Sequence, residues 1–260
     1  MTPDTLFCDL LAARSGIVCA VGAGGKKSVL RAIAAEHPGR VAVTGTVPFV
    51  PPPDSLSADR ITGDLDALAE QLDGDRHHRI VVFGRPAEKK GRWGGLPGEI
   101  IANWHPRFGF DVTLVKADGA RMRWVKAPAD DEPVLPPVYD TLIPVFSARA
   151  LGEPLTDRIA HRPSLVEHVT GCRAGEIFQP EHAARLLASN DGLLRGAGQS
   201  QVRPVINMVD DPQRRELALE AARLALEMTT RFDQLLLVRL KHTTELVEIV
   251  NRGAKQPCTP

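Results

Sequence analysis

Residues 17–35, IVCAVGAGGKKSVLRAIAA, join an apolar run to a glycine cluster, two lysines and a helical pattern. Glycines allow several backbone N–H groups to converge on an anion, and the start of a helix directs further N–H groups to the same place. A lysine adds a positive charge for the outer phosphates of a nucleotide. The sequence therefore predicts a phosphate-binding loop, formed by Gly22, Ala23, Gly24, Gly25, Lys26, Lys27 and Ser28.

The residue after Lys26 departs from the usual pattern of such a loop. The pattern G-x-x-x-x-G-K-[ST] ends in a hydroxyl residue that holds Mg²⁺, whereas Lys27 stands there in this chain. Ser28 follows one residue later and is the candidate metal ligand of the loop. The pattern favours binding of ATP or GTP, but Lys27 argues against an ordinary Mg²⁺ site.

Two other interpretations of this stretch remain open. The dinucleotide fingerprint G-x-G-x-x-G matches Gly22 and Gly24 but has Lys27 at its third position, and the next strand ends without the expected acidic residue. That strand ends in Thr44-Gly45-Thr46, where the Thr44 hydroxyl is a candidate contact for a phosphate or its metal. The second alternative is an ordinary glycine-rich turn with two solvated lysines.

Further polar residues follow other apolar runs. Asp118 ends the run VTLVKADG, where a carboxylate can orient Mg²⁺ or a water. His161 and Arg162 precede a proline and a helical segment, and arginine binds phosphates with two parallel hydrogen bonds. The alternative for this pair is a helix-entry turn with exposed polar residues.

The stretch Asn207-Met208-Val209-Asp210 is similar to the N-K-x-D element by which GTPases read guanine, with methionine replacing lysine. Asp210 would accept two hydrogen bonds from a guanine edge, and Asn207 would support it. The alternative is a helix cap, in which Asp210 or Asp211 begins the helix at Pro212.

The elements that must position these residues alternate along the chain. Apolar runs rich in valine and isoleucine predict strands over residues 17–21, 41–44, 80–83, 112–115, 141–145, 202–207 and 234–238. Helical periodicity predicts helices over residues 28–36, 64–72, 98–105, 164–170, 180–188, 212–229 and 243–250. Strands alternating with helices indicate a mostly parallel sheet, whose ligands bind beyond the carboxyl ends of the strands.

Composition limits the classes of protein and partner. Hydrophobic residues make up 43% of the 260 residues, as in a globular protein, and the formal net charge is +0. We therefore expect neither nucleic acid nor membrane among the partners. The first residues lack the pattern of a signal peptide, which predicts a cytoplasmic protein. We expect a single domain over residues 1–260, with a flexible tail at residues 252–260.

Several motifs together resemble the YqeC family, whose members are accessory proteins linked to selenium-dependent molybdenum hydroxylases. The motifs GAGGKKS, ADGA, KAPADDEPV, HRPS and NMVD occur in the family's order, and the similarity runs from about Leu10 to about Val238. The chain departs from the family at Lys27, where the family has threonine, and at Lys116, where it has glutamate. The matching positions are Gly22, Gly24, Gly25, Lys26, Asp118, Gly119, Lys126, Ala127, Pro128, Glu132, Pro133, His161 and Arg162.

The resemblance implies an α/β fold of the P-loop NTPase type, a three-layer sandwich, and two alternative functions. In the first, the protein is a nucleoside triphosphatase or a phosphoryl or nucleotidyl transferase that helps to mature a molybdenum hydroxylase or its selenium-containing cofactor. Lys26 and Asp118 would then act on the phosphates, Glu132 and His161 would face a second substrate, and Lys126 and Arg162 would bind it. In the second, the protein does not hydrolyse its ligand and delivers a phosphate-bearing cofactor to the hydroxylase or its cofactor-handling proteins.

Overall fold

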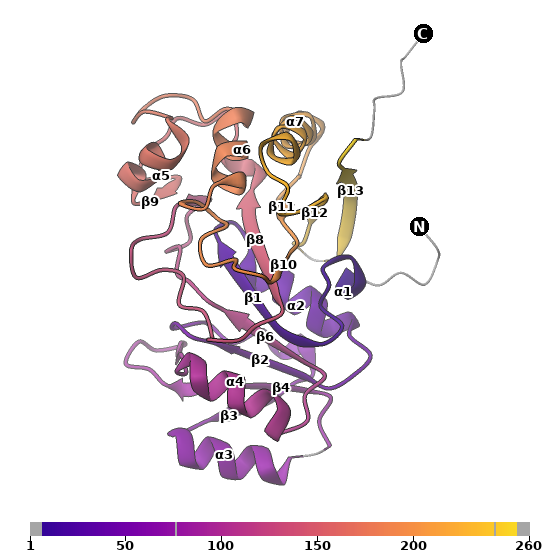
Figure 1. The fold of residues 1–260 in the computed structure, drawn as a ribbon. Helices are drawn as coiled ribbons and strands as arrows, with labels where there is room; N and C mark the ends of the chain where they lie inside the picture. The colour runs from indigo at the N-terminus through magenta and orange to yellow at the C-terminus, as the bar shows by residue number, and fades with distance from the viewer. Residues whose placement is uncertain (1–6, 76, 242, 254–260) are drawn as a thin grey trace.

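A computed structural model of the chain describes residues 7–75, 77–241 and 243–253, and a long sheet runs through this part of the chain (Figure 1). Its order is β13-β12-β11-β8-β1-β6-β2-β4-β3, with β10 beside β8 and β5 beside β4. The strands are β1 (Gly16–Gly22), β2 (Val41–Gly45), β3 (Asp59–Thr62), β4 (Ile80–Pro86), β5 (Trp93–Gly94), β6 (Val112–Lys116), β8 (Thr141–Ser147), β10 (Gln201–Val202), β11 (Val205–Asn207), β12 (Gln234–Arg239) and β13 (Glu245–Asn251). A separate pair joins β7 (Val125–Lys126) to β9 (Ala160–His161).

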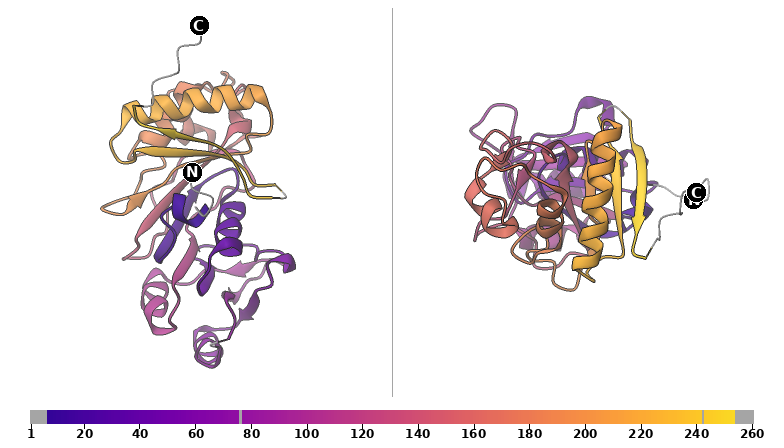
Figure 2. Two further views of the ribbon diagram at one scale, coloured as in Figure 1. Left: turned by 90° about the vertical axis from the view of Figure 1, so that its right-hand side faces the viewer. Right: turned by 90° about the horizontal axis from the view of Figure 1, so that it is seen from above.

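Helices cover both faces of the sheet (Figure 2). The α-helices are α1 (Phe7–Leu10), α2 (Lys26–Glu36), α3 (Leu65–Gly74), α4 (Gly98–Arg107), α5 (Pro163–Thr170), α6 (Pro180–Ala188) and α7 (Pro212–Met228), and the short 3-10 helices are η1 (Asp54–Leu56) and η2 (Ala148–Ala150). Side chains of β1 alternate between two buried clusters, since Cys19 and Val21 pack with α3, α4, α6 and α7, whereas Val18 and Ala20 pack with α1 and α2. The arrangement confirms the predicted α/β three-layer sandwich.

The order of the strands identifies the edge where a ligand would bind. β1 pairs in parallel with both β6 and β8. Beyond β6 lie the strands formed by residues 41–86, and beyond β8 lie those formed by residues 205–251. The chain thus changes direction across the sheet at β1, and in open α/β sheets such a switch point forms a crevice at the carboxyl ends of the strands.

Two sequence-based predictions are corrected. The helix predicted over residues 243–250 is wrong, because β13 forms there and pairs antiparallel with β12. The strand predicted over residues 202–207 is interrupted at Arg203 and Pro204, because proline has no N–H group for a sheet ladder. Residues 254–260 of the predicted flexible tail lie outside the described residues. None of the helices in the described ranges is both long and apolar enough to span a membrane.

The proline-rich segment after β7 is an ordered strap, residues 127–140, that crosses the carboxyl edge of the sheet. Val134 N donates to Ala117 O at 2.9 Å, and the Thr46 hydroxyl donates to Val134 O at 2.5 Å. At the far end of the strap, Asp140 N donates to Ile17 O at 2.9 Å. The strap therefore fastens the end of β6 to the turn after β2 and returns to the start of β1.

Candidate functional site

The glycine loop lies at the carboxyl end of β1, pressed against two neighbouring strand ends. A Cβ atom on Gly24 would lie 2.3 Å from Ser147 Cβ, and one on Gly25 would lie 2.2 Å from Asn207 Nδ2. Both glycines have positive φ values, +87° and +129°, which residues with side chains adopt at a cost. Asn207 Nδ2 donates to Gly24 O at 2.9 Å, and its Oδ1 accepts from Leu240 N at 3.2 Å. Asn207 therefore anchors the loop.

The start of α2 offers backbone donors to an anion. Gly25 is the N-cap residue, and no side chain caps the helix there. The first N–H groups of a helix have no partner within it, and here they belong to Lys26, Lys27 and Ser28. The side chain of Lys27 is exposed and that of Ser28 is half-buried. The N-terminus of α2 therefore combines donor groups with positive charge, as an anion site requires.

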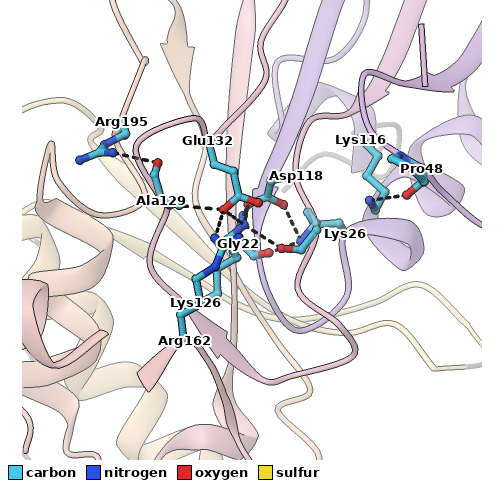
Figure 3. A network of polar contacts seen from close by, with 11 residues as sticks. Gly22, Lys26, Pro48, Lys116, Asp118, Lys126, Ala129, Glu132, Arg162 and Arg195 are labelled. Atoms are coloured by element: carbon cyan, nitrogen blue, oxygen red, sulfur yellow. Dashed lines mark hydrogen bonds and ion pairs between the residues drawn. The ribbon is translucent and has the colours of Figure 1, made fainter. Parts of the chain in front are cut away.

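Lys26 and Asp118 contact each other, and Asp118 also contacts the backbone of Gly22 in the glycine loop (Figure 3). The Lys26 side chain is 5% exposed, and its Nζ lies 2.7 Å from Asp118 Oδ1 and also donates to Gly22 O. Asp118, at the end of β6, accepts from Gly22 N at 2.9 Å through Oδ2. Burial lowers the pKa of Lys26, and the Asp118 carboxylate opposes that effect. Lys26, the lysine predicted to bind a phosphate, is therefore paired with the buried Asp118 carboxylate.

Lys126 forms the second half of the same network. Its side chain is completely buried, and Nζ donates to Gly119 O and to Glu132 Oε2, both at 2.7 Å. The same Nζ lies 3.2 Å from Asp118 Oδ2. Glu132 Oε2 also accepts from Arg162 Nη1 at 2.7 Å. The structure thus brings Lys26, Lys126, Asp118, Glu132 and Arg162 together in one chain of ion pairs.

We expect Glu132→Gln to lower the free energy of unfolding at pH 7 by about 3 kcal/mol, because Lys126 would lose a buried partner. Burial alone would raise the pKa of Glu132, but hydrogen bonds from Lys126, Ala129 N and Arg162 lower it from 4.5 to about 2. A carboxyl with a lowered pKa stabilises the fold above its unfolded value and loses that effect as the pH falls toward its folded value.

The pH dependence is the diagnostic part of this prediction. Urea unfolding between pH 7 and pH 3 should show the wild type losing stability below about pH 4.5, with a shallower loss in Glu132→Gln. Parallel pH profiles for the two proteins would contradict the stabilising role of the Glu132 carboxylate.

Lys116 adds a further positive charge near the loop. It ends β6, where it pairs in register with Ala20 of β1 and Gly45 of β2, and its Nζ donates to Pro48 O at 3.1 Å. Burial, together with the nearby Lys26 ammonium, lowers the pKa of Lys116 to about 7, and Asp118 only partly opposes this. Burial therefore disfavours the charged form of Lys116, which a bound anion would favour.

His161 lies beside Lys126, because β9 and β7 pair in parallel with these residues in register. Its side chain is mostly buried, and its Nδ1 has no hydrogen-bond partner among the described residues. Burial lowers the pKa of His161, and the positive charges of Arg162, Lys126 and Arg121 lower it further. The imidazole is therefore neutral at pH 7, with a ring nitrogen still able to bond.

Two other predicted residues have internal partners. The Thr44 hydroxyl is buried and donates to Phe83 O at 2.9 Å, which joins β2 to β4. The Asp210 carboxylate accepts from Arg149 Nε at 2.8 Å and Nη2 at 2.6 Å. Asp211 caps α7 by accepting from Arg214 N at 2.8 Å, which is the capping role considered for this stretch.

Arg195 belongs to the site but carries no sequence signal. Its Nη1 donates to Ala129 O at 2.9 Å, and it lines a cavity of about 10 Å³ together with Val21 and Asp118. The residue lies in the stretch GLLRGAG, which matches no binding motif. In the folded chain the strap places Ala129 within hydrogen-bond distance of Arg195.

The fold and the site define a three-layer α/β protein with a buried, cation-rich cluster at the carboxyl edge of a mostly parallel sheet. The chain belongs to the YqeC family, because the family model described as YqeC protein matches residues 18–164. It is similar to the protein YqeC of Escherichia coli (strain K12), with 27% identity over 205 residues, which cover 76% of this chain and 77% of that protein. The matched family region contains the glycine loop, Asp118, Glu132 and His161 but not Asn207 or Asp210.

Proposed function

We propose that this protein binds a nucleotide, ATP or GTP, by its phosphates at the glycine loop and the start of α2. The observation that carries the proposal is the buried Lys26 ammonium at an uncapped helix N-terminus. Backbone N–H groups and a lysine at such a position are the elements that hold phosphates in nucleotide-binding loops. A bound phosphate would replace Asp118 as the main partner of Lys26.

The role proposed for the bound nucleotide is in the maturation of a molybdenum hydroxylase or of its selenium-containing cofactor. This part rests on the family resemblance. Arg162 and the neutral His161 would face a second, anionic substrate, because the Arg162 side chain is 40% exposed and His161 Nδ1 has bonding capacity left. Asp118 would orient a water or the phosphate group once Lys26 has moved to the ligand.

A specific observation favours the alternative in which the ligand is held and delivered without hydrolysis. The Asp118 carboxylate already contacts Gly22 N, Lys26 Nζ and Lys126 Nζ. Glu132, with a pKa lowered to about 2, is a weak base at neutral pH. Neither carboxylate is arranged to activate a water, so slow or absent turnover is the expected behaviour of this site.

Lys26→Ala tests the phosphate site by calorimetric titration with ATP and GTP. We expect the wild type to bind one nucleotide and Lys26→Ala to bind it at least tenfold more weakly, a loss of about 1.4 kcal/mol or more. Lys90→Ala is the matched control, because it also removes a lysine charge but at an exposed position outside the glycine loop. A thermal unfolding curve for each variant separates lost binding from lost structure.

Failure of the folded wild type to bind either nucleotide would overturn the proposal. Where binding occurs, measurement of phosphate release distinguishes the two functions. Several turnovers for each protein molecule would identify a nucleoside triphosphatase. Tight binding without product would instead favour the delivery module.

A further inference from the structure

A magnesium ion bound beside the nucleotide would need oxygen ligands from this chain. Mg²⁺ takes oxygen ligands in near-octahedral geometry at about 2.0–2.1 Å and is usually held by one or two carboxylates together with phosphate oxygens and waters. The candidate ligands predicted from the sequence are Asp118 and Ser28. Their surroundings in the fold determine whether the site suits the ion.

The Asp118 carboxylate does not fit this requirement. Oδ1 lies 2.7 Å from Lys26 Nζ, and Oδ2 lies 3.2 Å from Lys126 Nζ while accepting from Gly22 N at 2.9 Å. Both oxygens thus face ammonium groups, one of which, on Lys126, is completely buried. A divalent cation at either oxygen would be repelled by these ammonium groups, and Lys126 would still face Oδ2 after Lys26 had turned to a phosphate.

The positions around Asp118 reinforce the mismatch. A lysine, Lys27, stands where the loop pattern has a metal-binding hydroxyl. Lys116 ends β6 between Ala20 of β1 and Gly45 of β2, and its Nζ donates to Pro48 O. Of the two metal ligands predicted from the sequence, only the Ser28 hydroxyl then remains. The donor set is that of an anion site and not that of a magnesium site.

We propose that this site takes its phosphate ligand free of divalent metal, with the ammonium groups of Lys26, Lys27 and Lys116 in place of Mg²⁺. The inference rests on the proposed function and specifies its ligand as a metal-free phosphoanion. Magnesium then competes with the protein for the ligand, because the metal and the lysines neutralise the same phosphate oxygens. Binding becomes weaker as the metal-bound fraction of the ligand rises.

The test is a calorimetric titration of ATP into the wild-type protein in excess EDTA and again in excess Mg²⁺. We expect excess Mg²⁺ to weaken binding by roughly tenfold. Equal affinity in the two solutions, or tighter binding with Mg²⁺, would overturn the metal-free site and leave the nucleotide site standing. Absence of binding in both solutions would overturn the nucleotide site itself, and the inference with it.

A double variant tests which residues exclude the metal. Lys27→Thr combined with Lys116→Glu supplies a hydroxyl and a carboxylate, which are oxygen ligands that Mg²⁺ accepts. We expect the variant to bind ATP more tightly with Mg²⁺ than without it, the reverse of the wild type. Lys90→Glu, an exposed position, makes the same charge change as Lys116→Glu and should keep the wild-type order.

An unchanged preference for metal-free ATP in the folded double variant would remove Lys27 and Lys116 from the explanation. If that variant fails to fold, the wild-type titration still decides the inference. A thermal unfolding curve of the double variant distinguishes these two cases.

Discussion

Asp118→Asn is expected to lower the free energy of unfolding by about 3–5 kcal/mol, because it leaves two buried ammonium groups without their shared carboxylate. Lys26 and Lys126 have side-chain exposures of 5% and 0%, so solvent cannot replace the lost charge. Asparagine keeps the size of the side chain and one oxygen for Gly22 N, so the change isolates the charge. Urea unfolding at pH 7 measures the loss.

Asp73→Asn is the matched control for Asp118→Asn. Asp73 pairs with Arg107 at 2.7 Å, but both side chains are about half exposed. Exposed pairs contribute about 0–1 kcal/mol, so this variant should remain close to the wild type. Similar stabilities for the two variants would mean that the network around Asp118 does not hold the fold together.

Gly24→Ala is expected to destabilise the protein by about 3 kcal/mol and to displace the glycine loop. A positive φ costs a residue with a side chain about 1–2 kcal/mol. The new methyl group would also lie 2.3 Å from Ser147 Cβ and 2.8 Å from the Ser147 backbone, and crowding of this kind costs about 1–3 kcal/mol. Urea unfolding gives the stability, and titration with ATP shows whether the displaced loop still binds.

Gly91→Ala separates the two contributions. Gly91 has a φ of +76°, close to that of Gly24, but no atom lies within 4 Å of the position that its Cβ would occupy. The expected loss is therefore the backbone cost alone, about 1 kcal/mol. A Gly24→Ala variant no less stable than Gly91→Ala would show that the loop is not pressed against the end of β8.

Much of the sheet can be predicted from the sequence because its central strands are short apolar runs buried on both faces. β13 cannot, since Leu246, Val247, Ile249 and Val250 have the spacing of a helix face. Antiparallel pairing with β12 and a high content of β-branched residues decide in favour of a strand. β3 also carries little signal, because Ile61 is its one fully buried residue.

The parts of the site are visible in the sequence, but their connections are not. Gly22, Lys26 and Asp118 follow two separate apolar runs, and the parallel pairing of β1 with β6 makes them neighbours. No local pattern predicts that Lys126 would share Asp118 with Lys26, since this contact depends on where β7 lies relative to the end of β6 in the fold. The same holds for Thr44 and Asp210, whose polar atoms bind Phe83 O and Arg149.

The shared carboxylate has a consequence for genetic screens of this protein. Lys26, Asp118 and Lys126 support one another, so a library of single substitutions would score all three as intolerant even under selection for protein abundance alone. A substitution at any of these three positions would therefore change protein stability and ligand binding at the same time. The exposed Lys27 is not part of this buried network. Loss of fitness at Lys27, with abundance unchanged, is the genetic signature of a ligand.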